Sequence, residues 1–371
     1  MASHPPQYAF LNDGPAALQA LLSAIAGAKS ALNLLYYIYE PDSTGIRIRE
    51  ALTAAAQRGV AVRLLIDGFG SRGLSEDFFA PLSAAGGQIC RFLPHMGRQY
   101  VLRNHQKMLL ADRDLAIVGG FNIGDSYFDP SHALGWRDLG LVLRGPDVAQ
   151  GHAYFDALWD WVQRGPARIL ELRRLLNIHS QKQGAVRWIF SGPGPRNAYA
   201  ASVRHDLVRA HRLDMMMGYF MPPPIILRML AHIARATRAR FVLAGQSDHI
   251  ITQYAARHSY RRLIAADAEV YEYLPRRLHA KLIVLDDIVY VGSANFDLRS
   301  LRINCEVMLR IENAALAKEA RRIIEDDINN SLAMDASLIA KRTGFWARLV
   351  QLFSYWFLSV FDLLLSRRLG T

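Results

Sequence analysis

The chain has 371 residues, of which 51% are apolar and 21% charged, with two cysteines and a net charge of +11. The apolar content excludes a disordered chain, and the two cysteines exclude a disulfide scaffold or a cysteine-rich metal site. The length exceeds what one hydrophobic core usually supports, so we expect two domains or one fold built twice. The positive charge favours a polyanionic partner, either nucleic acid or an anionic membrane.

The first half of the sequence predicts strands that alternate with helices. A strand signal at 8–11 leads to an amphipathic helix at 15–29 and an apolar run at 31–39. A second helix at 46–57 and a buried strand at 60–66 follow. This alternation is typical of an α/β architecture with a largely buried sheet.

The second half repeats the same order of elements. A strand at 186–190 leads to a helix at 198–211, and an apolar run at 215–221 is followed by a helix at 225–236 and a strand at 240–244. Repetition on this scale indicates a duplicated unit. We therefore predict an α/β fold of two pseudo-two-fold-related repeats, each a mixed β-sheet flanked by helices.

These patterns divide the chain into four parts. The predicted parts are a first repeat (1–165), a linker (166–184), a second repeat (185–337) and an apolar amphipathic C-terminal segment (338–371). The last part contains a mostly apolar stretch at 345–365, long enough to span a bilayer. Arg348 and Asp362 inside it would each cost about 3 kcal/mol at the membrane centre, so a helix lying in the membrane interface fits better. The alternative is a helix docked on the protein's own core.

Each half carries one copy of a sparse polar motif, His-x-Lys-x-x-x-x-Asp, followed by a turn of small residues and then Asn. The two copies consist of His105, Lys107, Asp112 and Asn122, and of His279, Lys281, Asp286 and Asn295. A shuffled chain of this composition would contain the motif ~0.01 times, so two copies at matching positions indicate a function.

The spacing within the motif has a chemical consequence. A His and a Lys two residues apart on a strand point to the same face, so each half offers one imidazole and one ammonium group. If the repeats face each other, both pairs converge on one cationic pocket that suits a phosphodiester. Two imidazoles on opposite sides of a phosphorus atom supply a nucleophile and a general acid. Lysine and asparagine side chains would stabilise the non-bridging oxygens, and no metal is then needed.

A nucleophilic imidazole needs a carboxylate or carbonyl on its other nitrogen, which holds one tautomer. Asp138 and Glu306 stand at corresponding positions of the two repeats, and we predict that they orient the histidines. For Asp112 and Asp286 we favour a structural pairing beside the site over proton transfer. Aromatic residues before the prolines of both halves fit a substrate entrance and a core equally well: Tyr36, Tyr37, Tyr39, Tyr219 and Phe220.

The remaining histidines are interpreted as satisfied structural residues, because a single histidine is more often part of a core than of a catalytic site. They are His4, His95, His132, His152, His179, His205, His211, His232, His249 and His258.

The duplicated motif resembles that of the phospholipase D superfamily, over residues 8–335. Within that superfamily the chain is similar to bacterial cardiolipin synthases of the short type. The segments that carry this narrower resemblance include 104–107, 118–124, 136–138, 278–281 and 292–300. The resemblance implies a ping-pong transfer through a phosphohistidine intermediate, without metal or other cofactor. It implies that one of the two histidines attacks a phosphatidylglycerol and that the other protonates the leaving glycerol and then activates a second phosphatidylglycerol, giving cardiolipin. By position we expect His105 to be the nucleophile and His279 the acid and base, although the pseudo-symmetric pocket makes either histidine chemically able.

The resemblance also implies an anionic phospholipid membrane as partner, with phosphatidylglycerol as donor and acceptor and no nucleic acid. The first residues carry no secretory signal, so we expect a protein on the cytoplasmic side of the bacterial cytoplasmic membrane, peripheral or anchored by its C-terminal segment. Three alternatives stay open: a phospholipid hydrolase, a metal-independent phosphodiesterase acting on nucleic acid, and a non-catalytic lipid-binding scaffold. The sequence does not indicate an oligomeric state.

Overall fold

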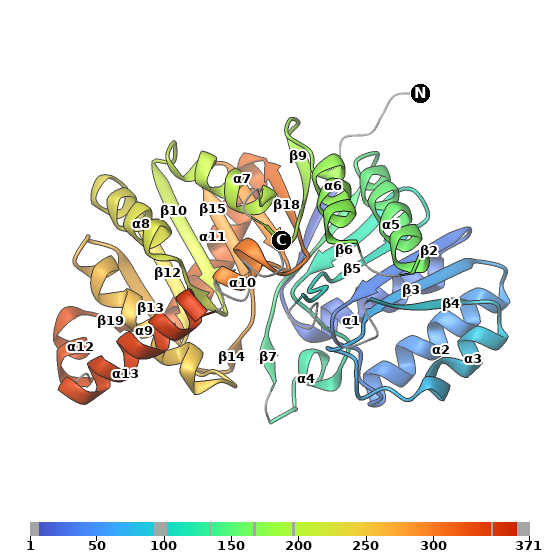
Figure 1. The fold of residues 1–371 in the computed structure, drawn as a ribbon, viewed down its shortest axis with the longest axis horizontal. Coiled ribbons are helices and arrows are strands. Elements are labelled where there is room, and N and C mark those ends of the chain that lie inside the picture. The colour runs from blue at the N-terminus through green and yellow to red at the C-terminus, as the bar shows by residue number, and fades with distance from the viewer. Residues whose placement is uncertain are drawn as a thin grey trace.

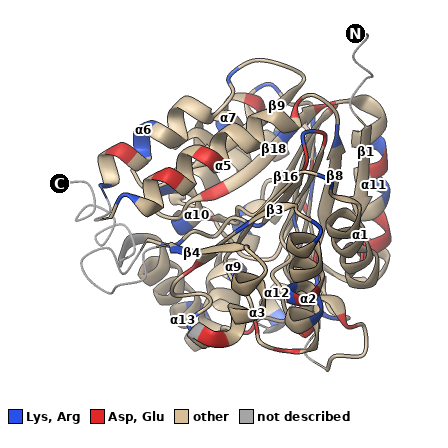
Figure 2. Ribbon diagram, turned by 90° about the vertical axis from the view of Figure 1, so that its right-hand side faces the viewer, with Lys and Arg blue, Asp and Glu red and all other residues tan. Residues whose placement is uncertain are grey.

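The computed structural model describes residues 7–92, 102–133, 135–165, 168–194, 197–342 and 344–361. Figure 1 shows two α/β halves that lie side by side, each with a twisted sheet and helices around it. The charged residues lie mainly on helices and loops rather than on the strands (Figure 2). This distribution is expected for sheets that are buried on both faces.

The first half contains a seven-stranded mixed sheet in the order β1-β8-β6-β5-β2-β3-β4. Its strands are β1 (Gln7–Leu11), β2 (Ala31–Tyr36), β3 (Ala61–Asp67), β4 (Gln88–Phe92), β5 (Met108–Ala111), β6 (Leu115–Gly119) and β8 (Gly140–Arg144). Its helices are α1 (Gly14–Gly27), α2 (Ser43–Gln57), η1 (Glu76–Phe79), α3 (Ala80–Ala84), α4 (Asp125–Phe128), α5 (Val148–Gln163) and α6 (Ile169–His179).

The second half contains an eight-stranded mixed sheet in the order β19-β13-β12-β10-β15-β16-β18-β9. Its strands are β9 (Val186–Ser191), β10 (Arg212–Met217), β12 (Arg238–Ala244), β13 (Glu269–Tyr273), β15 (Lys281–Leu285), β16 (Ile288–Gly292), β18 (Glu306–Glu312) and β19 (Ser331–Met334). Its helices are α7 (Ala198–Leu207), α8 (Pro224–Ala236), α9 (Ile250–Ile264), α10 (Leu298–Arg302), α11 (Ala314–Asn329), α12 (Ala336–Arg342) and α13 (Phe345–Trp356), followed by the π-helical turn η2 (Phe357–Phe361).

The two sheets have the same internal order. Read from β4 to β1, the strands of the first sheet correspond one by one to the strands of the second sheet read from β13 to β9. Strand β19 is an additional edge strand of the second sheet. In each sheet three strands pair in parallel and the others antiparallel. The prediction of an α/β fold with two mixed sheets flanked by helices is therefore confirmed.

A core shared by both halves lies between the sheets. It contains residues of β5 and β6 together with residues of β15, β16 and β18, and helices α5, α6 and α11 contribute to it. Two further cores lie outside, one beneath α1 and α2 and one beneath α7, α8 and α9. The shared core makes the relative position of the two halves part of the packing, because moving them apart would expose it to water.

The predicted linker at 166–184 contains α6, which is packed rather than extended. Leu172 and Leu176 of this helix are buried in the shared core, and α6 contacts both α5 and β9. Helix α6 packs against elements of both halves. The predicted division of the chain at 166–184 therefore stays a prediction.

The C-terminal helix α13 packs on α9 with its polar side inward. Gln351, Ser354 and Tyr355 are its buried residues, and the Tyr355 hydroxyl donates a hydrogen bond to the Pro222 carbonyl at 2.7 Å. Within the described part of the chain, no helix is both long enough and apolar enough to cross a membrane. The predicted apolar stretch continues to 365, and its last four residues lie outside the described residues.

Candidate active site

Two short contacts between the halves position the site. Strand β7 (Trp136–Arg137) pairs in parallel with β14 (Arg277–Leu278), and the His279 N–H donates to the Arg137 carbonyl at 2.8 Å. At the corresponding place, the His105 N–H donates to the Cys305 carbonyl at 2.9 Å. A backbone hydrogen bond thus fixes each histidine to a segment of the other half. The residue after the accepting carbonyl is acidic in both segments: Asp138 and Glu306.

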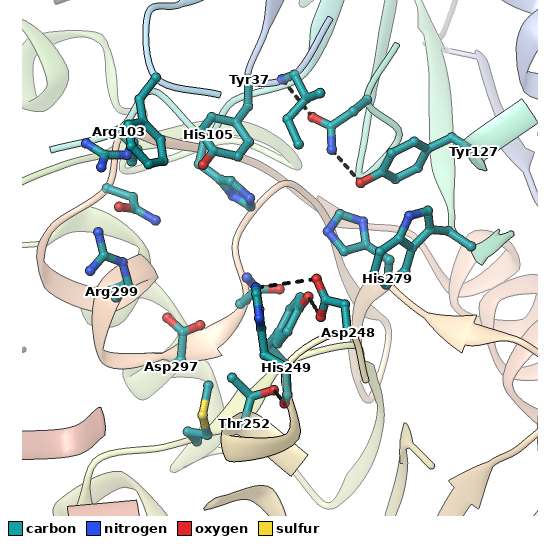
Figure 3. A pocket seen from close by; sticks show the side chains of 18 of the residues that line it. Tyr37, Arg103, His105, Tyr127, Asp248, His249, Thr252, His279, Asp297 and Arg299 are labelled. Carbon is teal, nitrogen blue, oxygen red and sulfur yellow. Dashed lines mark hydrogen bonds and ion pairs between the residues drawn. The ribbon is translucent and has the colours of Figure 1, made fainter. Parts of the chain in front are cut away.

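Both histidines line one cavity of about 580 Å³ at this junction. Figure 3 shows the two imidazoles entering it from opposite sides, with the cavity between them. This is the arrangement that the duplicated motif predicts if the halves face each other.

The His105 ring is held by a carboxylate from the other half. Its Nδ1 lies 3.1 and 3.0 Å from the two oxygens of Glu306, whose side chain is fully buried. The Ser293 and Ser300 hydroxyls donate to the same carboxylate at 2.5 and 2.8 Å. Because an ionised carboxylate only accepts, Nδ1 carries the proton and Nε2 keeps a free lone pair.

The His279 ring is held in the same way from the opposite direction. Its Nδ1 lies 2.6 Å from Asp138 Oδ2, and Asp138 Oδ1 accepts from the Leu139 N–H at 2.8 Å. The two predicted orienting carboxylates therefore do contact the histidines, and each contacts the histidine of the other repeat. The sequence pattern did not predict this crossed pairing, in which each carboxylate holds the histidine of the other repeat.

Burial decides the protonation of both imidazoles. It lowers the pKa of His105 to about 4, although Glu306 acts to raise it. Burial together with Lys281 lowers the pKa of His279 to about 4, against the effect of Asp138. Both rings are neutral at pH 7 in the empty cavity, which leaves each Nε2 able to act as a nucleophile or base.

The two motif lysines lie behind the histidines rather than on the cavity wall. Lys107 and Lys281 are fully buried, and each Nζ donates to the backbone carbonyl of the histidine two residues before it. Burial lowers the pKa of Lys107 to about 7 and that of Lys281 to about 8. Neither lysine is among the residues that line the cavity, and the prediction that they stabilise the non-bridging oxygens of a phosphodiester stays a prediction.

Both motif asparagines line the cavity. The Asn122 amide accepts from the Ile38 N–H at 3.2 Å and donates to the Tyr127 hydroxyl at 2.7 Å. The Asn295 Oδ1 is buried and has no hydrogen-bond partner among the described residues. The two amides are at the predicted place but are held differently.

Asp112 and Asp286 belong to the duplicated motif but do not line the cavity, so they are not part of the catalytic set. Asp112 accepts hydrogen bonds from the backbone of Lys29, Ser30 and Ala31. Burial acts to raise the pKa of Asp112, but these bonds and the Ser30 hydroxyl lower it to about 2. Asp286 accepts from the His211 N–H at 3.0 Å. Both aspartates fix a turn after the strand that carries the motif.

The undecided aromatic residues divide between wall and core. Tyr37 and Tyr219 line the cavity, whereas Tyr36, Tyr39 and Phe220 are buried in the cores of their halves. The orientation of each side chain relative to its strand decides this, and position before a proline does not.

Several cavity residues were not predicted. They include Arg103, Arg299, Trp136, Tyr127, Asp248 and His249. His249 is an error of the sequence analysis, because its side chain is 71% exposed and faces the cavity instead of a core. His132, His205, His211 and His232 are likewise exposed; His4 and His95 lie outside the described residues. Arg103 stands two residues before His105, so adjacency to the motif was the one available signal.

No cluster of three or more His, Cys, Asp or Glu side chains that could hold a metal ion occurs within the described ranges. The cavity wall includes imidazole, amide, guanidinium, hydroxyl, aromatic, a few carboxylate and some aliphatic groups.

Comparison with protein families matches residues 21–159 and 205–328 to a model described as "Cardiolipin synthase, PLD-like domain". The chain is 30% identical over 352 residues to cardiolipin synthase 1 of Bacillus cereus, covering 90% of this chain and 68% of that protein. It is 32% identical over 332 residues to the major cardiolipin synthase of Bacillus subtilis, covering 86% and 68%.

Among solved structures, the chain is similar to phosphatidylserine synthase of Haemophilus influenzae, with a TM-score of 0.74 and 13% identity over 97% of this chain and 94% of that one. Polyphosphate kinase of Porphyromonas gingivalis matches with a TM-score of 0.57 and 15% identity, over 87% and 50%. At these identities the two structures support the fold alone.

Proposed function

The chain belongs to the cardiolipin synthase family of the phospholipase D superfamily, and on this premise we propose that it is a phosphatidyltransferase that converts two phosphatidylglycerol molecules into cardiolipin and glycerol. One observation carries the proposal: two neutral imidazoles, each fixed through Nδ1 by a buried carboxylate of the other half, present Nε2 to one cavity. That pair supplies both sides of an in-line displacement at phosphorus.

In the first step we assign His105 as the nucleophile. Its Nε2 attacks the phosphorus of one phosphatidylglycerol, a P–N bond forms, and the bond from phosphorus to the glycerol oxygen breaks. His279 gives its Nε2 proton to that oxygen, and glycerol leaves. The bound phosphodiester anion raises the pKa of the nearby His279, so this ring is protonated in the complex although it is neutral in the empty cavity.

In the second step the hydroxyl of another phosphatidylglycerol takes the place of the glycerol. His279 removes its proton, the oxygen attacks phosphorus, and the P–N bond breaks, which regenerates neutral His105 and protonated His279. Lys107 and Lys281 support the negative charge of the transition state through the field of their buried ammonium groups. Asn295 offers an amide at the wall for a non-bridging oxygen.

We also propose that α13 contacts the phospholipid membrane that holds the substrate. Phe345, Trp346 and Phe353 are 70, 77 and 64% exposed, while Gln351, Ser354 and Tyr355 of this helix are buried. A helix that turns its apolar side outward in this way is stable only against another apolar phase. Leu358 of the following turn lines the catalytic cavity, so this surface is continuous with the entrance that a lipid would use.

Cations beside α13 fit an anionic membrane. Arg261, Arg262 and Arg348 line one surface hollow between α9 and α13, and all three are exposed. Each basic residue near an anionic surface contributes roughly 1 kcal/mol of attraction. We propose a peripheral attachment to the cytoplasmic side of the bacterial membrane on these grounds.

Product analysis tests the activity. The purified protein is incubated in EDTA with phosphatidylglycerol vesicles alone, and the lipids are identified by mass spectrometry; cardiolipin with an equimolar amount of glycerol is expected. Phosphatidic acid as the main product would make the protein a hydrolase. Cleavage of plasmid DNA without a lipid product would make it a nuclease.

Vesicle flotation tests the membrane surface. Replacing Trp346 and Phe353 by Ser should weaken binding to phosphatidylglycerol vesicles at least tenfold, because two large side chains no longer enter the apolar phase. Leu170→Ser with Ile178→Ser on α6 is the matched control, since those side chains are 67 and 77% exposed. Equal binding by wild type and the α13 variant would contradict the assignment.

A further inference from the structure

Arg103 and Arg299 lie on the side of the cavity near His105, with Asp297 beside Arg299 (Figure 3). The Tyr37 ring lies 4.9 Å from the His105 ring. Burial and the nearby Asp67 raise the pKa of Tyr37, and the guanidinium groups of Arg103 and Arg299 oppose that rise. Two arginines close to one tyrosine place positive charge where the oxygens of a phosphodiester attached to His105 would lie.

The opposite side, near His279, is built from the loop between β12 and α9. Asp248 Oδ1 accepts a hydrogen bond from the Tyr219 hydroxyl at 2.5 Å, and the Tyr219 ring meets the His279 ring edge-on at 6.1 Å. His249 Nε2 lies 3.5 Å from the second oxygen of Asp248. A carboxylate at this place repels phosphate oxygens and accepts hydrogen bonds from hydroxyl groups.

The proposed reaction explains why the His105 side and the His279 side of the cavity differ. In an in-line displacement the alcohol lies opposite the nucleophile, both when it leaves and when its successor enters. With His105 as nucleophile, every alcohol of the cycle passes beside His279. That side therefore needs groups that recognise an alcohol and disfavour an anion.

We infer that Asp248, with Tyr219 and His249, forms a subsite for the hydroxyl groups of a polyol headgroup beside His279. The inference rests on the proposed transferase activity and adds a specificity-determining residue to it. Asp248 would accept a hydrogen bond from a hydroxyl of glycerol, and His249 can donate one or accept one according to its tautomer.

A polyol fits this subsite better than an ammonium headgroup does. Hydroxyl groups donate and accept, as the wall requires, whereas an ammonium only donates. The Trp136 and His279 rings are tilted towards each other with centroids 5.3 Å apart, and the Arg277 guanidinium lies 5.8 Å from the centroid of the Trp136 ring. A cation therefore already rests against this ring, which makes it a weaker partner for an ammonium group.

Competition between acceptors tests the subsite, because all acceptors react with one phosphoenzyme. Phosphatidylglycerol vesicles are incubated with deuterated glycerol, ethanol and choline, and the three exchange products are measured by mass spectrometry. Asp248→Asn should lower the ratio of deuterated phosphatidylglycerol to phosphatidylethanol about tenfold, since a hydrogen bond to a charged group is lost. A product ratio does not depend on the fraction of folded enzyme.

Two variants complete the test. His249→Gln, at an exposed position, should shift the same ratio in the same direction and keeps the test valid if Asp248→Asn folds poorly. Asp326→Asn on α11, an exposed aspartate outside the cavity, should leave the ratio unchanged.

The possible results distinguish a failure of the subsite from a failure of the proposed transferase activity. An unchanged glycerol-to-ethanol ratio in both Asp248→Asn and His249→Gln would overturn the subsite while leaving the transferase intact. If the Asp248→Asn variant lost transfer to choline but retained transfer to glycerol, the polyol assignment would be overturned in favour of an ammonium site. A wild type that forms no exchange product at all would overturn the proposed function, and the subsite with it.

Discussion

Glu306 and Asp138 hold the two cavity histidines through the same contact, but the two carboxylates are themselves held by different means. Glu306 accepts from the hydroxyls of Ser293 and Ser300 in addition to His105. Asp138 has the neighbouring backbone N–H of Leu139 and lies against Gly120, where a Cβ would approach its Oδ1 to 2.1 Å. One half fixes its carboxylate by hydrogen bonds and the other by close backbone approach.

This difference shows that the small-residue turn after each motif serves the carboxylate. Gly119-Gly120 and Gly292-Ser293 occupy the same place in the two repeats. The shorter Asp138 needs an approach that only glycine allows, and the longer Glu306 needs a hydroxyl at the corresponding position. Turn residue and carboxylate are matched within each half, so neither can be exchanged alone.

The largest effect is expected from removing the histidines, and it distinguishes their roles. His105→Ala and His279→Ala should each lower the rate with phosphatidylglycerol by at least ~10³-fold, because nucleophile or proton donor is lost. With a p-nitrophenyl phosphodiester, whose leaving group needs no proton, His279→Ala should recover the first step and release a stoichiometric burst of p-nitrophenolate, and His105→Ala should release none. Turnover of His279→Ala stays slow, because His279 also activates the acceptor in the second step. Recovery in the His105 variant instead would reverse the two assignments.

The carboxylates come next. Asp138→Asn and Glu306→Gln should each lower kcat roughly 10- to 100-fold, because an amide no longer holds the imidazole in one tautomer. The Asp138 variant should be less impaired in the burst of p-nitrophenolate from the p-nitrophenyl phosphodiester, since Asp138 acts through His279 and that leaving group needs no proton. Glu312→Gln, at the exposed end of the same strand as Glu306, is the control. An equal loss in that control would assign the effect to the strand rather than to the carboxylate.

Exchanging the turn residues tests their matching. Gly120→Ser should displace Asp138, lower activity severalfold and cost about 1–3 kcal/mol of the free energy of unfolding, because the added Cβ overlaps the carboxylate. Ser293→Gly removes the hydrogen bond to Glu306 and the one that its hydroxyl accepts from the Val307 N–H, so it should lower kcat about fivefold and lower Tm without displacing the carboxylate. Steady-state kinetics and thermal denaturation measure both. Equal effects of the two substitutions would contradict the difference between the halves.

The smallest effect concerns pH. Burial lowers the pKa values of His105 and His279 to about 4 from an ordinary 6.5, so the unfolded chain binds two protons between pH 6.5 and 4 that the folded chain does not. Stability is therefore full above pH 6.5 and falls as pH drops towards 4. The double variant His105→Gln, His279→Gln should lose less stability between pH 7 and 5 than the wild type, measured as urea midpoints. Equal losses would show that other groups carry the dependence.

The sequence predicted what depends on local order along the chain. The alternation of strands and helices, the duplication, and the presence of His105 and His279 with Asp138 and Glu306 were readable because period and motif spacing are local properties. The crossed pairing was not readable, since it depends on how two sheets meet across the shared core. The same holds for Asp248 and His249, which a loop between β12 and α9 brings to the cavity.

The lysines illustrate a different limit. Spacing predicts that His105 and Lys107 share a face of a strand, but the structure has no strand at these two residues, since β5 begins at Met108. The irregular segment lets Lys107 turn back to the His105 carbonyl. Lys281 makes the same contact to the His279 carbonyl although it is the first residue of β15, because His279, like His105, precedes the strand.

The crossed support of the imidazoles has a consequence during synthesis. When the first repeat has left the ribosome, His105 lacks Glu306 and has no carboxylate to fix its ring, and Asp138 has no ring to hold. On the proposed mechanism, a half-translated chain would hold His105 without the carboxylate that fixes its tautomer. The proposed activity would arise only when the second repeat docks and brings Glu306 to His105 and His279 to Asp138.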